Sequence, residues 1–303
     1  MPDPRFHDRR YVLASRIGEG WVLYLAALGG VGEPATVRFE GVGEDAFLRL
    51  PGLETEFSPV VTDRNDRRAA YVRPAELIRP GPVTLVAGPE LPDWVADALT
   101  EDASRVARVL EDRLGAPALT PPTILASYDP SQEGFSFKGG AMDGATMRLV
   151  MRSNLSEPNE ATRRQLAGFT AHETVHVWLN EVWDTTENAE QPWLHEGAAE
   201  YLADRLSMEA GEFEKEAIRH VTDCLAKLGD RPLNGSDGVT YGAVPYDCGF
   251  TIQLAAEVAS VRRGEGDALD LWRGIVTDAP DATYDSAAFI AAATRSLPSP
   301  MPF

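Results

Sequence analysis

Cysteine, basic charge and long apolar runs are all scarce in this sequence of 303 residues. The two cysteines, Cys224 and Cys248, are too few for a disulfide framework, and we expect two separate thiols in helical segments. Lysine and arginine number 28 against 47 acidic residues, and the formal net charge of -19 argues against nucleic-acid binding. No run of about 20 apolar residues is present, which excludes a membrane-spanning helix.

What the sequence does contain is the composition of an ordinary globular protein, with 44% hydrophobic and 25% charged residues. The acidic excess predicts either a solvated surface or a cleft that attracts cationic peptides. The apolar stretch from Trp21 to Val31 follows Glu19 and is broken by Gly29 and Gly30, which suits a strand better than a signal peptide. Cytoplasmic residence is therefore the default expectation, although a signal peptide removed earlier would leave no trace.

Residues 1–90 predict a β-rich N-terminal domain. Short runs with β-branched residues, such as 35–39 and 83–86, are separated there by Gly and Pro. From Pro92 onward the apolar residues instead recur at the spacing of a helix. We therefore place a domain boundary near residue 90, with residues 91–303 forming the second domain.

The second domain combines a few strands with many helices. Its first helix is expected to end near Gly115. We predict strands at 123–128 and 146–151, with a glycine-rich turn at Gly139 and Gly140 between them. The remainder predicts helices, mainly at residues 159–180, 194–208, 212–228 and 245–261. This order predicts an α+β fold with a mainly helical C-terminal half.

Histidines gather in one part of the chain. Three of the five, His172, His176 and His195, lie within residues 172–195. The segment His172-Glu-Thr-Val-His176 puts two imidazoles four residues apart, hence on one helical face, with Glu173 a step around the same surface. Two nitrogen ligands and a carboxylate are thereby aimed at one point. Two surface histidines beside a solvated glutamate are the alternative that this short pattern leaves open.

A catalytic zinc site needs a third protein ligand and one open position for water. Glu196 is the candidate, because it begins a predicted helix and nineteen residues, 177 through 195, separate it from His176. A helix, a loop and a second helix can bring its carboxylate back to the metal. The neighbouring His195 diverges by about 100 degrees around the helix, and we expect a partly exposed residue that does not share the ion.

The two segments resemble those of the gluzincin zinc metallopeptidases, especially the aminopeptidase N family, in which a His-Glu-x-x-His helix precedes a Trp-Leu-x-Glu-Gly helix. Trp193-Leu-His-Glu196-Gly matches the second motif, although the spacer is one residue longer than is typical of that family and equals that of thermolysin-like enzymes. The resemblance implies a thermolysin-like catalytic domain, a small mixed sheet plus helices, over about residues 92–295. It also implies one zinc ion (Zn²⁺) per chain, with Glu196 as third ligand and Glu173 as general base.

Three further candidate residues follow from the resemblance, one on the Glu196 helix and two in a separate segment. Glu200, four residues after Glu196, stands where such enzymes have a carboxylate that orients a ligating imidazole, and an exposed helix residue is the alternative. The segment Tyr241-Gly-Ala-Val-Pro-Tyr246 is similar to the family segment in which a tyrosine follows proline at a helix start. The resemblance implies that Tyr246 donates a hydrogen bond to the oxyanion. Tyr241 also matches a family tyrosine and is a candidate substrate-binding residue; a core-packed Tyr246 is the alternative.

The segment Gly139-Gly-Ala-Met-Asp143-Gly144 resembles the Gly-x-Met-Glu-Asn signature on the edge strand beside the zinc. In the family this strand binds extended substrate by adding it to the sheet edge. The resemblance therefore implies substrate binding by Gly140, Met142 and Asp143. Asp143 stands where the family has the longer glutamate that holds the substrate's amino terminus, which weakens the expectation of aminopeptidase specificity. A glycine turn is the alternative for this block.

Residues and resemblance together predict a zinc-dependent metallopeptidase that acts on peptide or protein substrates and is aminopeptidase-like. Alternatives are an endopeptidase, a relative of the glycyl aminopeptidases, whose motif helix also continues with a tryptophan as at Trp178, or an inactive zinc-bearing peptide-binding module. The presence of both Glu173 and Tyr246 favours an enzyme, because metal binding alone needs neither. A His-His-Glu site also binds cobalt or manganese.

Overall fold

The computed structural model describes residues 14–24, 35–36, 60–61, 69–72, 77–114, 122–131, 133–142, 146–155, 157, 159–179, 184–185, 191–233, 242–278 and 283–294. The chain divides into two compact units, residues 1–104 with 118–173, and residues 105–117 with 174–303. The division falls inside two continuous helices, α1 (Asp93–Leu114) and α2 (Glu160–Val177). The predicted boundary near residue 90 stays a prediction.

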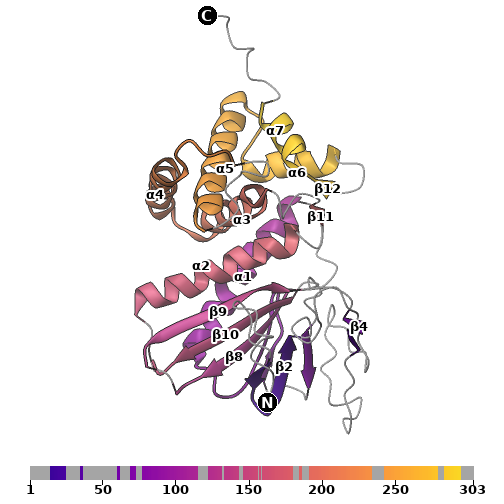
Figure 1. Cartoon of the computed structure of the whole chain (residues 1–303), viewed down its shortest axis with the longest axis vertical. Helices are drawn as coiled ribbons and strands as arrows, with labels where there is room; N and C mark the ends of the chain where they lie inside the picture. Colours follow the sequence, from indigo (N-terminus) through magenta and orange to yellow (C-terminus); the bar gives the residue numbers. More distant parts are fainter. Residues whose placement is uncertain are drawn as a thin grey trace, which may run out of the picture. The chain divides into compact units, whose positions relative to one another are not determined.

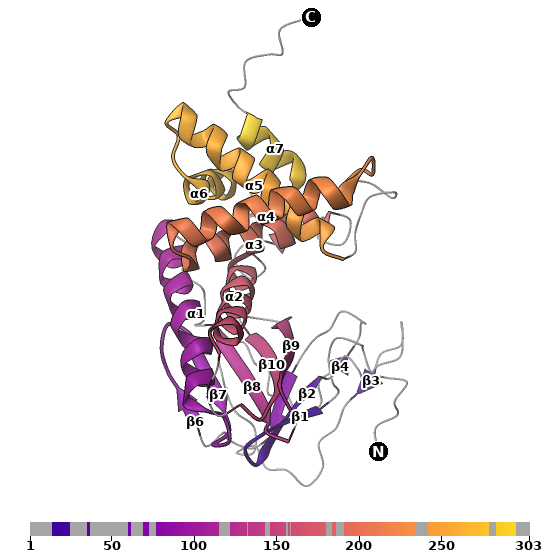
Figure 2. The ribbon, with the colours of Figure 1, turned by 90° about the vertical axis from the view of Figure 1, so that its left-hand side faces the viewer.

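A five-stranded mixed sheet lies at the centre of the first unit, in the order β6-β7-β8-β10-β9 (Figure 1 labels β8, β10 and β9, and Figure 2 also labels β6 and β7). Its strands are β6 (Leu77–Arg79), β7 (Thr84–Ala87), β8 (Thr123–Asp129), β9 (Phe135–Met142) and β10 (Thr146–Ser153). The central strands β7, β8 and β10 are parallel, whereas β6 and β9 pair antiparallel at the two edges. The strands predicted at 83–86, 123–128 and 146–151 are thereby confirmed.

Gly139 and Gly140 lie inside the edge strand β9, and the turn predicted at these residues is wrong. Gly139 pairs with Leu149 and Gly140 pairs with Arg148. A Cβ atom on Gly139 would lie 2.3 Å from the carbonyl oxygen of Arg148, so glycine is what lets β9 approach β10 this closely. The edge-strand position that the resemblance implied for this segment is confirmed.

Helices cover one face of this sheet, as Figure 2 shows for α1 and α2. The inward side of α1 is apolar, with Val95 and Leu99 fully buried, and the helix ends at Leu114 as predicted. Helix α2 packs against β9 through Phe169 and Phe137, whose ring centroids are 4.9 Å apart. The packing places the edge strand beside the helix that carries the histidine motif.

A second, three-stranded antiparallel sheet has the order β1-β2-β5 and consists of β1 (Ala14–Ile17), β2 (Gly20–Tyr24) and β5 (Ala69–Val72). Two short strands, β3 (Ala35–Thr36) and β4 (Val60–Val61), pair separately. The buried Ser15 of β1 accepts hydrogen bonds from Arg148 and Ser127 of the larger sheet. These strands confirm the β-rich character predicted for the N-terminal part.

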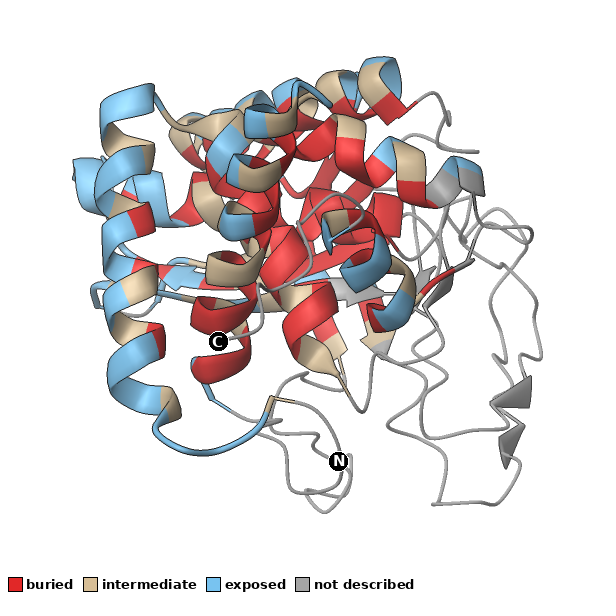
Figure 3. Cartoon of the chain, turned by 90° about the horizontal axis from the view of Figure 1, so that it is seen from above, coloured by how far each residue is buried: buried red, intermediate tan, exposed pale blue. Residues whose placement is uncertain are grey.

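The second unit is mainly helical. It contains α3 (Pro192–Ser207), α4 (Ala210–Leu228), α5 (Val244–Arg263), α6 (Ala268–Asp278) and α7 (Ser286–Thr294), with the short parallel pair β11 (Asp184–Thr185) and β12 (Thr283–Tyr284). Figure 3 shows that buried residues lie on the inner sides of the helices and exposed residues on the outer sides. The predicted helices and the α+β class with a helical C-terminal half are confirmed.

Helices α3 and α5 cross in backbone contact at two glycines. A Cβ atom on Gly197 would lie 2.3 Å from the Cα atom of Gly249, and one on Gly249 would lie 2.1 Å from the carbonyl oxygen of Trp193. No larger residue fits either position without a shift of the backbone. Gly197 directly follows Glu196, and Gly249 follows Tyr246 by about one helical turn. The crossing therefore brings the segments that carry these two residues side by side.

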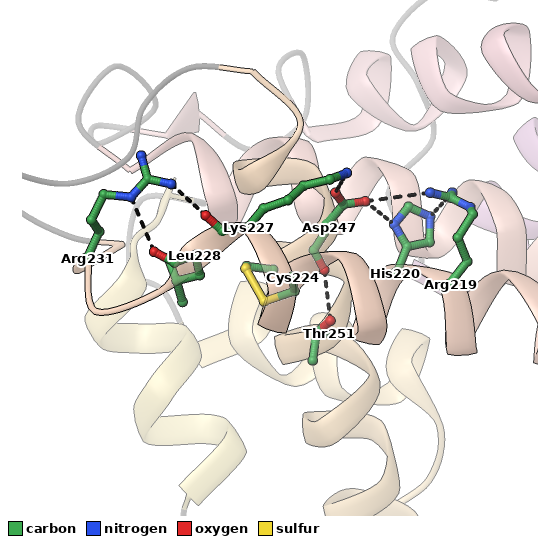
Figure 4. The surroundings of a disulfide bond; sticks show 9 residues. Arg219, His220, Cys224, Lys227, Leu228, Arg231, Asp247 and Thr251 are labelled. Atoms are coloured by element: carbon green, nitrogen blue, oxygen red, sulfur yellow. Dashed lines mark hydrogen bonds and ion pairs between the residues drawn. A yellow bond between two sulfur atoms is a disulfide. The ribbon is translucent and has the colours of Figure 1, made fainter.

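Cys224 of α4 and Cys248 of α5 form a disulfide, and the expectation of two separate thiols is wrong (Figure 4). Their Cα atoms are 4.7 Å apart although the residues are separated by 24 positions in the sequence. Both cysteines lie in the apolar contact between the two helices, together with Val244 and Leu228. Structural disulfides persist mainly in oxidising compartments, so the default of cytoplasmic residence finds no support here. In the part of the chain that the structure describes, no helix has the length and apolar character needed to cross a bilayer.

Removing the disulfide is expected to lower the free energy of unfolding by about 3 kcal/mol, because the cross-link restricts the unfolded chain. The measurement is urea unfolding of the Cys224→Ala, Cys248→Ala double variant. Wild-type protein in a thiol reductant is the control, because it loses the cross-link and keeps both side chains. An unfolding midpoint equal to that of the oxidised wild type in both samples would contradict the assignment.

Candidate metal centre

His172, His176 and Glu196 converge on one point, with one ligand atom from each lying within 4.8 Å of the others. The two histidines lie one turn apart on α2, and Glu196 lies near the start of α3. Nε2 of His176 is 3.1 Å from Oε2 of Glu196. Two imidazole nitrogens and one carboxylate oxygen form the donor set of a catalytic zinc site, which leaves a coordination position for water. The residues present therefore fit a zinc ion.

Burial excludes the alternative of two surface histidines. His172 is 8% exposed, His176 is 5% exposed and Glu173, between them on α2, is 8% exposed. Burying three ionisable groups on one helix is costly unless each is engaged by a partner. The buried setting is consistent with a helix that is built to hold a cation rather than to face solvent.

His195 occupies a place that the sequence did not indicate. It was expected to be partly exposed, but it is only 3% exposed. Its ring stacks on the ring of His176, with the centroids 4.2 Å apart, and its Nδ1 is 2.9 Å from the hydroxyl oxygen of Tyr284 in β12. The contact orients a candidate ligand from a residue outside the ligand set. The residues next to His195 in the sequence could not indicate this contact, because its partner Tyr284 is 89 residues away.

Glu200 lies one turn after Glu196 on α3. Its Oε1 is 3.7 Å from Nε2 of His220, which belongs to α4 and was not among the predicted site residues. His220 stands four residues before Cys224, on the same face of α4. A predicted pairing of Cys224 with Cys248 would have placed this face of α4 against α5 and so pointed to His220. The predicted role of Glu200, orienting a ligating imidazole, stays a prediction.

The candidates for transition-state and substrate contacts are placed only in part. Tyr246 is half-buried in the first turn of α5, and Gly140 is buried in β9. Met142 is the last residue of β9. Tyr241 and Asp143 lie outside the described residues.

A second group of metal-binding residue types, Asp204, Glu216 and His220, also lies close together. Here Arg219 donates a hydrogen bond to Nε2 of His220 at 2.8 Å, so that nitrogen has no lone pair left for a cation. Burial, together with the positive charge of Arg219, lowers the pKa of His220 and keeps its ring neutral at neutral pH. The second group is therefore a hydrogen-bonded cluster, and the first is the better metal centre.

Part of the chain matches a family of known proteins. Residues 91–223 match the family described as peptidase of plants and bacteria, and this segment contains both motif helices. No curated protein matches the chain.

Two solved structures have a similar fold. An aminopeptidase N family protein from Idiomarina loihiensis aligns with a TM-score of 0.58 and 12% identity, over 90% of this chain and 58% of that one. Native LTA4 hydrolase from yeast aligns with a TM-score of 0.59 and 14% identity, over 91% of this chain and 47% of that one. The chain thus spans about half the length of these structures. The chain therefore has an α+β fold similar to that of these two proteins, as the resemblance of its two motif helices implied.

Proposed function

We propose that this chain is a zinc-dependent metallopeptidase that hydrolyses peptide bonds and is aminopeptidase-like. The observation that carries the proposal is the convergence of His172, His176 and Glu196 on one point, beside the buried carboxylate of Glu173. When bound, zinc supplies Lewis-acid polarisation of the scissile carbonyl and lowers the pKa of a water molecule toward neutrality.

Glu173 is the proposed general base. Glu173 lies between the two candidate histidine ligands on α2, and it is buried with them. It would take a proton from the attacking water and pass that proton to the leaving amine. A buried carboxylate suits this role because proton transfer is then screened from bulk solvent.

Tyr246 is the proposed donor to the oxyanion. It stands about one helical turn before the crossing of α5 with α3, and Glu196 directly precedes that crossing on α3. A phenol is a neutral hydrogen-bond donor at neutral pH, and such donors stabilise the charge that develops on the carbonyl oxygen. The edge strand β9 is the proposed place for the substrate backbone, which would extend the five-stranded sheet.

The first test pairs metal analysis of the purified protein with hydrolysis of a mixed peptide library. About one zinc per chain and cleavage that stops on chelation and returns with zinc are expected. His176→Ala should lose the metal, whereas His220→Gln should keep it, because His220 belongs to the second group of metal-binding residue types. Zinc without cleavage would favour the inactive binding module, and protein without zinc would overturn the proposal.

The products of the same digest separate the two peptidase classes. An aminopeptidase removes residues from free amino termini and leaves the same peptides intact when their amino termini are acetylated. Cleavage of both forms at internal bonds would instead identify an endopeptidase. Removal of single amino-terminal residues is the expected result.

A further inference from the structure

The first turn of α5, which carries Tyr246, is not held by a side-chain cap. Its N-cap residue is Ala243, which makes no capping hydrogen bond through its side chain, and a proline occupies one of the first two helical positions. Uncapped first turns leave backbone N–H groups without helical partners and are prone to fray. Some other contact must therefore fix this turn.

Asp247, the residue after Tyr246, makes that contact with α4 (Figure 4). Its side chain is 3% exposed, and its carboxylate accepts hydrogen bonds from Nδ1 of His220 at 2.9 Å and Nζ of Lys227 at 3.0 Å. A third partner, the cationic Arg219, has Nη1 3.6 Å from the same carboxylate. A buried carboxylate with several partners is held in a single orientation.

The protonation of His220 is set by its two neighbours. Arg219 can only donate, so Nε2 of His220 is the acceptor and Nδ1 carries the hydrogen that points to Asp247. A neutral ring fixed in one tautomer is a directional donor, as in pairs where a carboxylate and an imidazole orient each other. The hydrogen bond to Asp247 therefore exists at neutral pH.

The same face of α4 also holds the next residue of α5. His220, Cys224 and Lys227 recur at helical spacing, and Cys224 forms the disulfide with Cys248. Gly249 then lies against the backbone of α3 at the crossing. Three consecutive residues after Tyr246 are thus fixed, the first two by α4 and the third by α3.

We propose that Asp247 is a positioning residue for Tyr246: its hydrogen bonds to His220 and Lys227 hold the first turn of α5 so that the phenol meets the developing oxyanion. The proposal rests on the proposed function, in which Tyr246 stabilises the transition state. A displacement of about 1 Å at such a contact can lower turnover by about 10²-fold. Asp247 itself touches α4 and acts only through its neighbour.

Asp247→Asn tests the proposal with little change of shape. We expect kcat per zinc-loaded, folded molecule to fall by about 10-fold, with KM within about twofold and zinc content unchanged, because the metal ligands lie on other helices. In a Tyr246→Phe background, which alone should cost about 10²-fold, Asp247→Asn should cause no further loss of kcat. Lys227→Met removes one half-exposed partner of Asp247 and should lower kcat by less than Asp247→Asn does. This loss of kcat should likewise vanish in the Tyr246→Phe background.

Glu257→Gln is the matched control on the same helix. Glu257 is also a buried α5 carboxylate, it accepts hydrogen bonds from Tyr201 and Arg205, and it lies ten residues beyond Asp247. This variant should lose stability and keep the kcat of its folded fraction. Full kcat in Asp247→Asn and Lys227→Met, or equal losses with and without the Tyr246 hydroxyl, would overturn the inference alone. Wild-type protein without zinc-dependent turnover would overturn the proposed function, and the inference with it.

Discussion

Replacing Glu173 by Gln is expected to lower kcat by about 10²- to 10⁴-fold while one zinc stays bound per chain. The substitution keeps the shape of the side chain and removes only its ability to accept and release a proton. The two histidines and Glu196, which form the candidate ligand set, are untouched. The measurement is the steady-state rate of hydrolysis of a peptide that the wild-type protein cleaves, together with zinc analysis of the same sample.

Glu160→Gln is the control for this change, since Glu160 lies in the first turn of the same helix and its side chain is 84% exposed. Its exposed pair with Arg164 contributes little to stability, so both kcat and zinc content should equal those of the wild type. Full activity of Glu173→Gln would exclude the general-base mechanism. Loss of zinc from that variant would instead mean that Glu173 supports the ligands.

Gly197→Ala is expected to destabilise the protein by about 3 kcal/mol or more. Its Cβ atom would lie 2.3 Å from Cα and 2.4 Å from the carbonyl carbon of Gly249, so the crossing helices would have to separate. The shift would also move Glu196, the residue before Gly197, and weaken metal binding. Urea unfolding and a zinc competition titration with a chromophoric chelator measure the two effects.

Gly274→Ala is the matched control in the same unit. Gly274 lies inside α6, and a Cβ atom there would meet no heavy atom within 4 Å. Alanine is favoured over glycine in a helix interior, so this variant should gain about 0.5–1 kcal/mol and bind zinc as the wild type does. A Gly197→Ala protein as stable as the wild type would show that α3 and α5 do not meet as described.

Local spacing was enough to predict the elements that carry the site. The interval between His172 and His176 puts both rings on one face of any helix, and the apolar period of residues 92–115 defines α1 whatever it packs against. The Glu196 helix was likewise predicted from its own residues and its resemblance. Sequence spacing could not give the distance between α2 and α3. Only the folded chain brings their candidate ligands close enough to bind one ion.

Features that depend on contacts between distant segments were missed or predicted wrongly. Gly139 and Gly140 have the local preference of a turn, but pairing with β10 makes them part of a strand. Cys224 and Cys248 pair because α4 and α5 present these faces to each other, and His195 is buried because Tyr284 returns from 89 residues away.

The sequence by itself determined which residues share a helix face or a strand, and with that the motif chemistry of α2 and α3. The tertiary structure alone decided which faces meet. It set the edge position of β9, the disulfide, the glycine crossing of α3 with α5, and the hydrogen bond between His220 and Asp247. The physical reason is that the period of a helix or strand arises from local backbone geometry, whereas the choice of neighbour depends on packing over the whole chain.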